Sequence, residues 1–286
     1  MLLTVPLSFQ YYQPTLLGDL YTCFIWAFAQ ADAPLRLSYD DFSIRMSEKL
    51  GLNGEISGVM LEDEALIGFV LQSRAPFQGL DTVYNGGTGV LVEYRGKGII
   101  QEIYENLLPH LRESGAERIL LEVITTNVSA LKLYQVMGFK KKQLLHCFKG
   151  AVLLDLPLNH LIFRESQDFK LDRFKAFADF SPSFIDSNAR LNANWKYEKL
   201  IEGYQGETLM GYIIFQQHLG RISQMGVRKD CRRQGVGTAL LGYAQQECQR
   251  ELTVMNIPSE AKGMFSFLRN TGLVNNVDQY EMEMRL

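Results

Sequence analysis

The sequence predicts an α/β protein in which two similar domains follow one another. One observation is a short string that occurs twice, and the other is that the predicted strands and helices around it recur in the same order. The chain has 286 residues, of which 47% are hydrophobic, and this suits two modest globular domains. Four matching pairs of residues are each displaced by 137 positions: Gly89, Val90, Arg95 and Gly98 match Gly226, Val227, Arg232 and Gly235. An offset of about half the chain length indicates a duplicated domain.

The first predicted element is a helix over residues 16–30. Apolar side chains recur there at helical spacing, namely Leu16, Leu20, Cys23, Phe24 and Ala27. The run resembles a secretory signal, but no lysine or arginine precedes Arg36, and the run is too short to span a membrane. We therefore expect a soluble, cytoplasmic protein without a membrane partner. A second helix is expected over residues 39–50.

The remaining elements of the first half lead into and out of the repeated string. Residues 56–61 and 65–72 are predicted strands around an acidic turn, and residues 87–92 form a strand that runs into the loop. A helix follows over 99–115, with apolar residues on one face and Gly115 as its stop. Residues 118–124 are almost continuously apolar, as in a buried central strand. A short helix over 127–139 begins near Asn127 and ends at Gly138.

The second half repeats this order of elements. Strands are predicted over 208–217, 221–227 and 252–257, and helices over 236–251 and 261–272. No proline- or serine-rich linker separates the halves, so we expect them to pack closely. The predicted boundary falls near residues 147–155, which gives an N-terminal domain of residues 1–149 and a C-terminal domain of residues 150–286.

Composition excludes some classes of function. The formal charge is −3 and the sequence pI is about 5.9, so an extended nucleic-acid-binding surface is not expected. The four cysteines form no CxxC pair and have no metal-ligand spacing with the four histidines. We therefore expect reduced thiols and no metal site.

The repeated string predicts an anion-binding loop. Where a strand enters a glycine-rich turn that opens a helix, successive backbone N–H groups point outward, and the helix dipole adds partial positive charge. Gly98 and Gly235 would allow close approach of an oxyanion, and Arg95, Lys97, Arg232 and Arg233 would add charge-assisted contacts. The string fits neither the GxxxxGK[ST] phosphate loop nor the GxGxxG dinucleotide fingerprint.

The pattern present is R-x-x-G-x-[G/A]. It is complete at Arg232, Gly235 and Gly237, and incomplete at Arg95 and Gly98 because Ile100 takes the last position. With its strand, its helix and the string "NVSALKLYQVMGF" after the next strand, the chain resembles the GNAT acyltransferase superfamily. The loop resembles that family's motif A, which binds the pyrophosphate of acetyl-CoA, and residues 127–139 resemble motif B.

The resemblance implies, in each domain, a mixed, mostly antiparallel sheet flanked by helices, in which the strand before the loop splays from its neighbour and pantetheine lies in the gap. It implies acetyl-CoA as co-substrate. The residues that it places at the cofactor are Val90, Leu91, Val92, Arg95, Gly96, Lys97, Gly98, Ile99, Ile100 and Asn127 in the first half, and Val227, Arg232, Arg233, Gln234, Gly235, Val236, Gly237 and Thr238 in the second.

The two halves differ at the positions that would do chemistry. In the family a tyrosine of motif B often protonates the leaving thiolate, and the first half has Tyr134 there, whereas the second half has Leu268. We therefore expect the first half to be catalytic, although the branched side chain of Ile100 could crowd the phosphate. Glu122, on the central strand, and Glu93, at the edge of the loop, are the candidates for the general base.

The leading prediction is acetyl-CoA-dependent N-acetylation of a small-molecule or peptide amine by direct attack. Two alternatives stay open: a non-catalytic CoA-binding or scaffold protein, and a tandem aminoacyl transferase that uses charged tRNA. Release of CoA thiol with a panel of amines separates the first alternative from an enzyme. The acidic pI argues against the second, and absence of tRNA binding at low salt would remove it. The sequence names neither the acceptor nor the oligomeric state.

Overall fold

The computed structural model describes residues 6–29, 37–152 and 161–286. The chain divides into two compact units, and neither is a single continuous segment. Unit 1 comprises Met1–Glu122, Ser129–Lys140 and Met282–Leu286, and unit 2 comprises Val123–Val128 and Lys141–Glu281. The predicted boundary between residues 149 and 150 stays a prediction.

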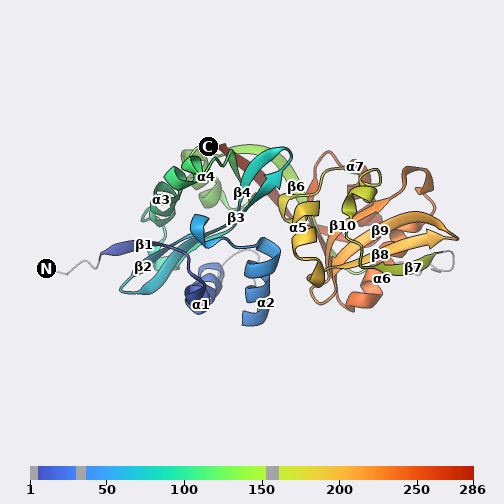
Figure 1. Cartoon of the computed structure of the whole chain (residues 1–286), viewed down its shortest axis with the longest axis horizontal. Helices are drawn as coiled ribbons and strands as arrows, with labels where there is room; N and C mark the ends of the chain where they lie inside the picture. Colours follow the sequence, from blue (N-terminus) through green and yellow to red (C-terminus); the bar gives the residue numbers. More distant parts are fainter. Residues whose placement is uncertain (1–5, 30–36, 153–160) are drawn as a thin grey trace. The chain divides into compact units, whose positions relative to one another are not determined.

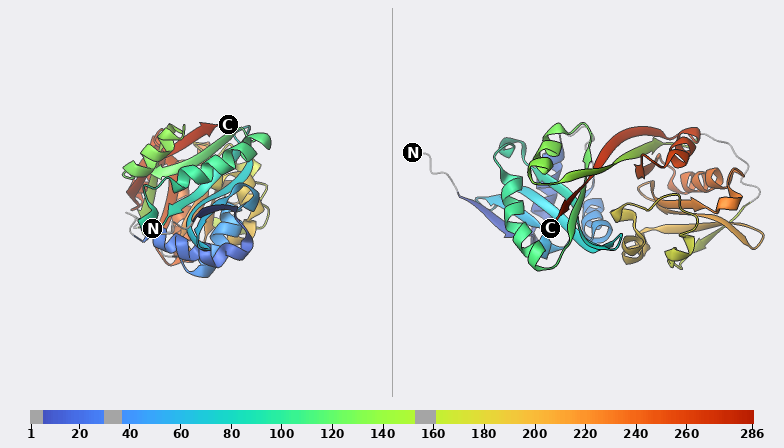
Figure 2. Two further views of the ribbon diagram at one scale, coloured as in Figure 1. Left: turned by 90° about the vertical axis from the view of Figure 1, so that its left-hand side faces the viewer. Right: turned by 90° about the horizontal axis from the view of Figure 1, so that it is seen from above.

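Unit 1 is built on a sheet with the strand order β1-β2-β3-β4-β5 (Figure 1). Neighbouring strands are antiparallel except β4 and β5, which are parallel. Helices α1 and α2 lie on one face of the sheet and α3 and α4 on the other (Figure 2). The strands are β1 (Leu7–Tyr11), β2 (Gly58–Glu62), β3 (Ala65–Phe77), β4 (Leu80–Val90) and β5 (Arg118–Ile124). The helices are α1 (Leu17–Phe28), α2 (Tyr39–Ile44), α3 (Ile99–Glu113) and α4 (Val128–Val136).

Unit 2 has the strand order β12-β6-β11-β10-β9-β8-β7, and from β6 to β7 the neighbouring strands are antiparallel except β10 and β11, which are parallel. Its strands are β6 (Lys140–Gly150), β7 (Ile162–Ser166), β8 (Lys199–Gln205), β9 (Thr208–Gln216), β10 (Arg221–Val227), β11 (Leu252–Pro258) and β12 (Val274–Arg285). Its helices are α5 (Asn188–Ala193), α6 (Val236–Cys248) and α7 (Lys262–Asn270). The last residues of β12, from Met282 onward, belong to unit 1.

The parallel strand pair of each unit separates after a short contact. In unit 1, β4 and β5 pair only over Thr82–Tyr84 with Arg118–Leu120, and in unit 2, β10 and β11 pair only over Arg221–Ile222 with Thr253–Val254. One extra residue, Gly86 in β4 and Ser223 in β10, bulges from the ladder just beyond this contact. The predicted fold class, a mostly antiparallel, splayed sheet flanked by helices in each unit, is confirmed.

The amphipathic pattern that predicted α1 and α3 reflects their burial against the sheet. In α1 the buried side chains are Leu20, Cys23, Phe24 and Ala27, as the helical spacing predicted. In α3 the buried face includes Ile103, Tyr104, Leu107 and Leu111. No helix in the described ranges is both long enough and apolar enough to cross a membrane.

Candidate active site

The loop between β4 and α3 exposes backbone donors. Gly96 and Gly98 have φ angles of 74° and 81°, in the left-handed region that favours glycine. The first hydrogen bond of α3 runs from the Glu102 N–H to the Gly98 carbonyl, at 3.0 Å. The N–H groups of Ile99, Ile100 and the following residue therefore precede the first intrahelical bond and point out of the helix start, where they can bind an anion.

This loop is fixed to the rest of unit 1. The Leu91 N–H donates to the Ile67 carbonyl of β3 at 2.9 Å, and the Tyr94 hydroxyl donates a short hydrogen bond to Glu62. Because N–H groups alternate in direction along a strand, the Val90 N–H faces the side that β5 has left. The exposed Val92 and Glu93 lie in the 3-10 turn that follows.

Two cations of this loop have no carboxylate partner within the described ranges. The Arg95 guanidinium donates a hydrogen bond of 2.8 Å to the Ala27 carbonyl, in the last turn of α1. The Lys97 ammonium lies 4.7 Å from the centroid of the Tyr94 ring. Their charges therefore remain available to an anionic ligand at the start of α3.

The corresponding loop of unit 2 has the same backbone shape but a different charge balance. Gly235 has a φ of 82° and precedes α6. Arg232 pairs with Asp179 at 2.6 Å and also donates to the Phe177 carbonyl at 3.2 Å, while Arg228 pairs with Asp230 at 2.7 Å. Two of its cations are thus neutralised, although Arg233 is exposed. Gln234 is exposed, Val236 is buried, and Val227 and Thr238 are half-buried.

The two units have different residues at the last position of the loop motif, Gly237 in unit 2 and Ile100 in unit 1. A Cβ on Gly237 would lie 3.1 Å from the Phe267 ring of α7, so a ring from another helix occupies the space beside this glycine. In unit 1 the matching residue, Ile100, is itself buried with 6% of its surface exposed. Its branched side chain therefore packs into the interior of unit 1, away from the exposed loop.

Tyr134 of α4 is buried beside the part of β4 that β5 does not pair with. The Asn85 amide of β4 donates to Thr88 Oγ1 at 2.7 Å, to the Tyr104 hydroxyl at 2.8 Å and to the Tyr134 hydroxyl at 3.5 Å. Burial raises the pKa of Tyr134, and its hydrogen bonds with Thr88 and Asn85 oppose the rise. The phenol therefore keeps its proton at neutral pH and can serve as a proton donor.

Glu122 lies at the fork of the splayed strands, two residues beyond Leu120, where the pairing of β5 with β4 ends. It accepts a hydrogen bond of 2.6 Å from the Tyr84 hydroxyl. The matching residue of unit 2 is Asn256, which accepts a short hydrogen bond from Gln279 and has a φ of 61°. A carboxylate can take up a proton and an amide cannot at neutral pH, so only unit 1 has a proton-accepting side chain at this position.

Tyr84, Asn85 and Thr88 were not among the predicted site residues. The first two lie in the early part of β4, which the sequence did not predict as a strand. Asn127 was among the residues predicted at the cofactor. It belongs to unit 2, in the short segment Val123–Val128. Its N–H donates to the Ile124 carbonyl at 2.9 Å. In the described ranges no group of three or more histidine, cysteine or acidic side chains is placed to hold a metal ion.

Unit 2 has a cleft at the fork of β10 and β11. Its walls include Met225, Met255 and Met264, together with the amides of Gln224 and Asn256. Asp186, which also lines it, is neutralised by a bidentate pair with Arg221 at 2.6 and 2.7 Å. Leu268, at the position of Tyr134, is fully buried in the core and offers no proton.

Both halves of the sequence match models of known protein families. The model described as "Acetyltransferase (GNAT) family" matches residues 17–139, and the model described as "Acetyltransferase (GNAT) domain" matches residues 166–267. N-alpha-acetyltransferase 30 of Schizosaccharomyces pombe is 32% identical over 88 residues, which are 30% of this chain and 57% of that protein. The curated relatives are matched over 31% to 57% of their own length.

Two solved structures resemble almost the whole chain. One is a GCN5-related N-acetyltransferase from Sphaerobacter thermophilus, with a TM-score of 0.70 and 16% identity over 99% of this chain and 97% of that chain. The other is a tandem GNAT protein from the clavulanic acid biosynthesis pathway, with a TM-score of 0.71 and 11% identity over 98% of both chains. At these identities the likeness is one of fold.

Proposed function

Because the chain belongs to the GNAT acetyltransferase family, as a member with two GNAT domains in tandem, we propose that it is an acetyl-CoA-dependent N-acetyltransferase whose working site lies in unit 1. The proposed acceptor is a small-molecule or peptide amine, and the proposed location is the cytoplasm. Unit 2 is proposed to be non-catalytic, because Leu268 and Asn256 stand where unit 1 has Tyr134 and Glu122.

In the proposed reaction the amine attacks the thioester carbonyl directly. A C–N bond forms, the C–S bond breaks, Glu122 takes up the proton that the amine loses, and Tyr134 protonates the leaving thiolate. The Val90 N–H, on the open side of β4, would polarise the carbonyl. Arg95, Lys97 and the first N–H groups of α3 would hold the pyrophosphate, so that the two reactants are in line.

The observation that carries this proposal is the position of the Tyr134 hydroxyl. It lies 3.5 Å from the Asn85 amide, at the stretch of β4 that has separated from β5. The charge balance of the loops supports the same choice of unit, because Arg95 lacks a carboxylate partner in the described ranges, whereas Arg232 is paired with Asp179.

Calorimetric titration of acetyl-CoA into Gly98→Asp and Gly235→Asp tests the proposal. The two glycines are a matched pair, since their φ angles are 81° and 82° and a Cβ on either would have no atom within 4 Å. Backbone strain is therefore the same in both variants, and only the position of the new carboxylate differs. We expect Gly98→Asp to abolish binding and Gly235→Asp to leave it within about twofold of wild type.

Two results would contradict this assignment. Loss of binding in Gly235→Asp alone would move the working site to unit 2. No acetyl-CoA binding by the folded wild-type protein would remove the acetyltransferase function and leave the fold standing. Binding without release of CoA thiol across a panel of primary amines would favour the alternative of a non-catalytic CoA-binding protein.

A further inference from the structure

The last five residues of the chain belong to the unit that contains the proposed site. Met282–Leu286 are part of unit 1, although the residues before them belong to unit 2. The side chains of Met282 and Met284 are buried, with 0% and 6% exposed. The Leu286 N–H donates to the Glu117 carbonyl, next to the start of β5, at 3.1 Å. The end of the chain is therefore an integral part of unit 1.

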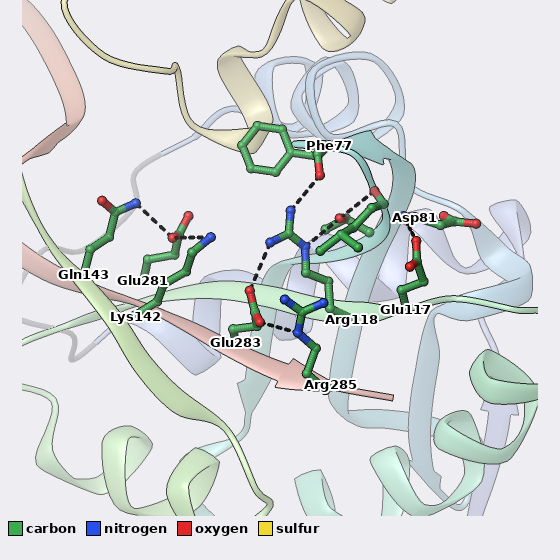
Figure 3. Close-up of polar contacts among 11 residues, drawn as sticks. Phe77, Asp81, Glu117, Arg118, Lys142, Gln143, Glu281, Glu283 and Arg285 are labelled. Carbon is green, nitrogen blue, oxygen red and sulfur yellow. Dashed lines mark hydrogen bonds and ion pairs between the residues drawn. The ribbon is translucent and has the colours of Figure 1, made fainter.

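A buried ion pair fastens this C-terminal segment to β5 (Figure 3). Arg118, with 2% of its surface exposed, donates to Glu283 at 3.0 Å. Its other donors reach Thr82 Oγ1 of β4 at 2.8 Å and the Phe77 carbonyl of β3 at 2.7 Å. The guanidinium thus ties three strands to the C-terminal segment, and Glu283 is the carboxylate that balances its buried charge.

The same segment also touches the turn that follows α4. A Cβ on Gly138 would lie 3.8 Å from the Met284 sulfur, so the thioether packs where the chain leaves the helix. The next residue, Phe139, donates its N–H to the Tyr134 carbonyl at 2.9 Å, and its ring centroid is 5.3 Å from that of Tyr134. The C-terminal segment therefore contacts β5, which carries Glu122, and the turn that follows α4, which carries Tyr134.

We propose that Met282–Leu286 are positioning residues for the general base and general acid of unit 1, with Arg118–Glu283 as the central contact. This proposal rests on the proposed function. The loop that would bind the pyrophosphate is held instead by β3, by the end of β2 and by the end of α1, through the contacts of Leu91, Tyr94 and Arg95. Loosening the C-terminal segment should therefore impair the chemical step far more than acetyl-CoA binding.

Glu283→Gln and Glu281→Gln provide a matched test. Glu281 lies two residues earlier on the same strand, is buried with 3% exposed, and contacts Lys142 at 3.4 Å and Gln143 at 2.9 Å, all in unit 2. Both variants remove one carboxylate charge of β12 that pairs with a cation; Glu283 also pairs with the exposed Arg285, at 2.6 Å. The measurements are peptide-resolved hydrogen exchange, kcat with a reactive amine, and the calorimetric Kd for acetyl-CoA.

For Glu283→Gln we expect faster exchange in peptides that cover residues 118–122 and 129–139. We expect kcat to fall by about 10- to 100-fold, as misplacement of catalytic groups by about 1 Å does, while the Kd for acetyl-CoA stays within about threefold. For Glu281→Gln we expect faster exchange around residues 141–148, and a kcat within about threefold of wild type.

A double variant, Arg118→Met with Glu283→Leu, tests the cause of the loss. In Glu283→Gln the buried guanidinium of Arg118 has lost its carboxylate partner. The double variant removes both charges, so its exchange protection and much of its kcat should return toward the wild-type values. The proposal is overturned if Glu283→Gln leaves the exchange of β5 and α4 unchanged, or if Glu281→Gln lowers kcat equally. Absence of acetyl transfer by wild type would instead remove the proposed function, since the exchange measurement needs no activity.

Discussion

At the scale of single residues, the two units differ in two side chains that carry the proposed proton transfers. Unit 1 has a buried phenol, Tyr134, and a carboxylate, Glu122, which accepts from the Tyr84 hydroxyl at 2.6 Å. Unit 2 has Leu268 and Asn256 at these positions. The splayed strand pair and the helix after the loop are present in both units, so this part of the fold does not depend on the two side chains.

Tyr134→Phe should lower kcat by about 10²- to 10⁴-fold, the usual contribution of a general acid. The free energy of unfolding should fall by about 1 to 2 kcal/mol, because the hydroxyl loses its hydrogen bonds with Thr88 and Asn85, the latter a long one of 3.5 Å. Steady-state kinetics and denaturant unfolding check both values. An unchanged kcat with a rate-limiting chemical step would exclude Tyr134 as the acid.

The pH dependence follows from the direction of the Tyr134 shift. Burial raises the pKa of Tyr134 above its ordinary value of 10.0, and a general acid acts only in its protonated form. Activity should therefore show no loss due to Tyr134 as the pH rises from 7 to about 10. A pH–rate profile of kcat checks this, and a fall near pH 8 that vanishes in Tyr134→Phe would contradict it.

At the scale of elements, strands and helices with strong local patterns were predicted well. The predicted bounds 118–124 and 221–227 are those of β5 and β10. In β4, by contrast, Asn85-Gly86-Gly87 has the composition of a turn, yet Gly86 is a bulge within the strand, and a Cβ on it would lie 2.2 Å from Leu50. Composition alone does not distinguish a bulge from a turn, and for this reason the sequence missed the β4 residues around Tyr134.

Strands β6 and β12 were missed for a different reason. Membership of Met282–Leu286 in unit 1 depends on contacts such as Arg118–Glu283, whose partners are 165 positions apart in the sequence. Periodicity within a short window carries no information about a partner at that distance. The loop motif was recognisable because strand, glycine turn and helix are contiguous, whereas the β4 residues around Tyr134 come from a distant segment.

The contact between α6 and α7 gives a prediction at this scale. Gly237→Ala would place a Cβ 3.1 Å from the Phe267 ring, whereas Gly263→Ala in α7 would meet no atom within 4 Å. Alanine is favoured over glycine in a helix by about 1 kcal/mol, so Gly263→Ala should stabilise the protein by up to that amount. Gly237→Ala should be less stable than Gly263→Ala in urea unfolding, because the ring must shift. Equal stability of the two variants would show that the Phe267 ring can shift without a measurable loss of stability.

At the scale of the whole molecule, all four cysteines are free and buried. Burial raises the pKa of Cys23 to about 12 and that of Cys248 to about 11, so the reactive thiolate is scarce at neutral pH. Native protein should therefore react slowly with an aromatic disulfide reagent at pH 7.5, and all four thiols should become titratable in denaturant. Rapid reaction of one thiol in the native state would reveal local opening near that residue.

The membership of Met282–Leu286 in unit 1 also has a consequence for synthesis. Domains generally fold from the N-terminus as the chain emerges from the ribosome. Here the carboxylate that neutralises Arg118 lies 165 positions after it, so it emerges only after the residues of unit 2 that precede it. Unit 1 therefore begins to form before unit 2 but is completed only after Lys141–Glu281 have been synthesised, and a nascent chain that stalls before Glu283 would hold a buried guanidinium without its counter-charge.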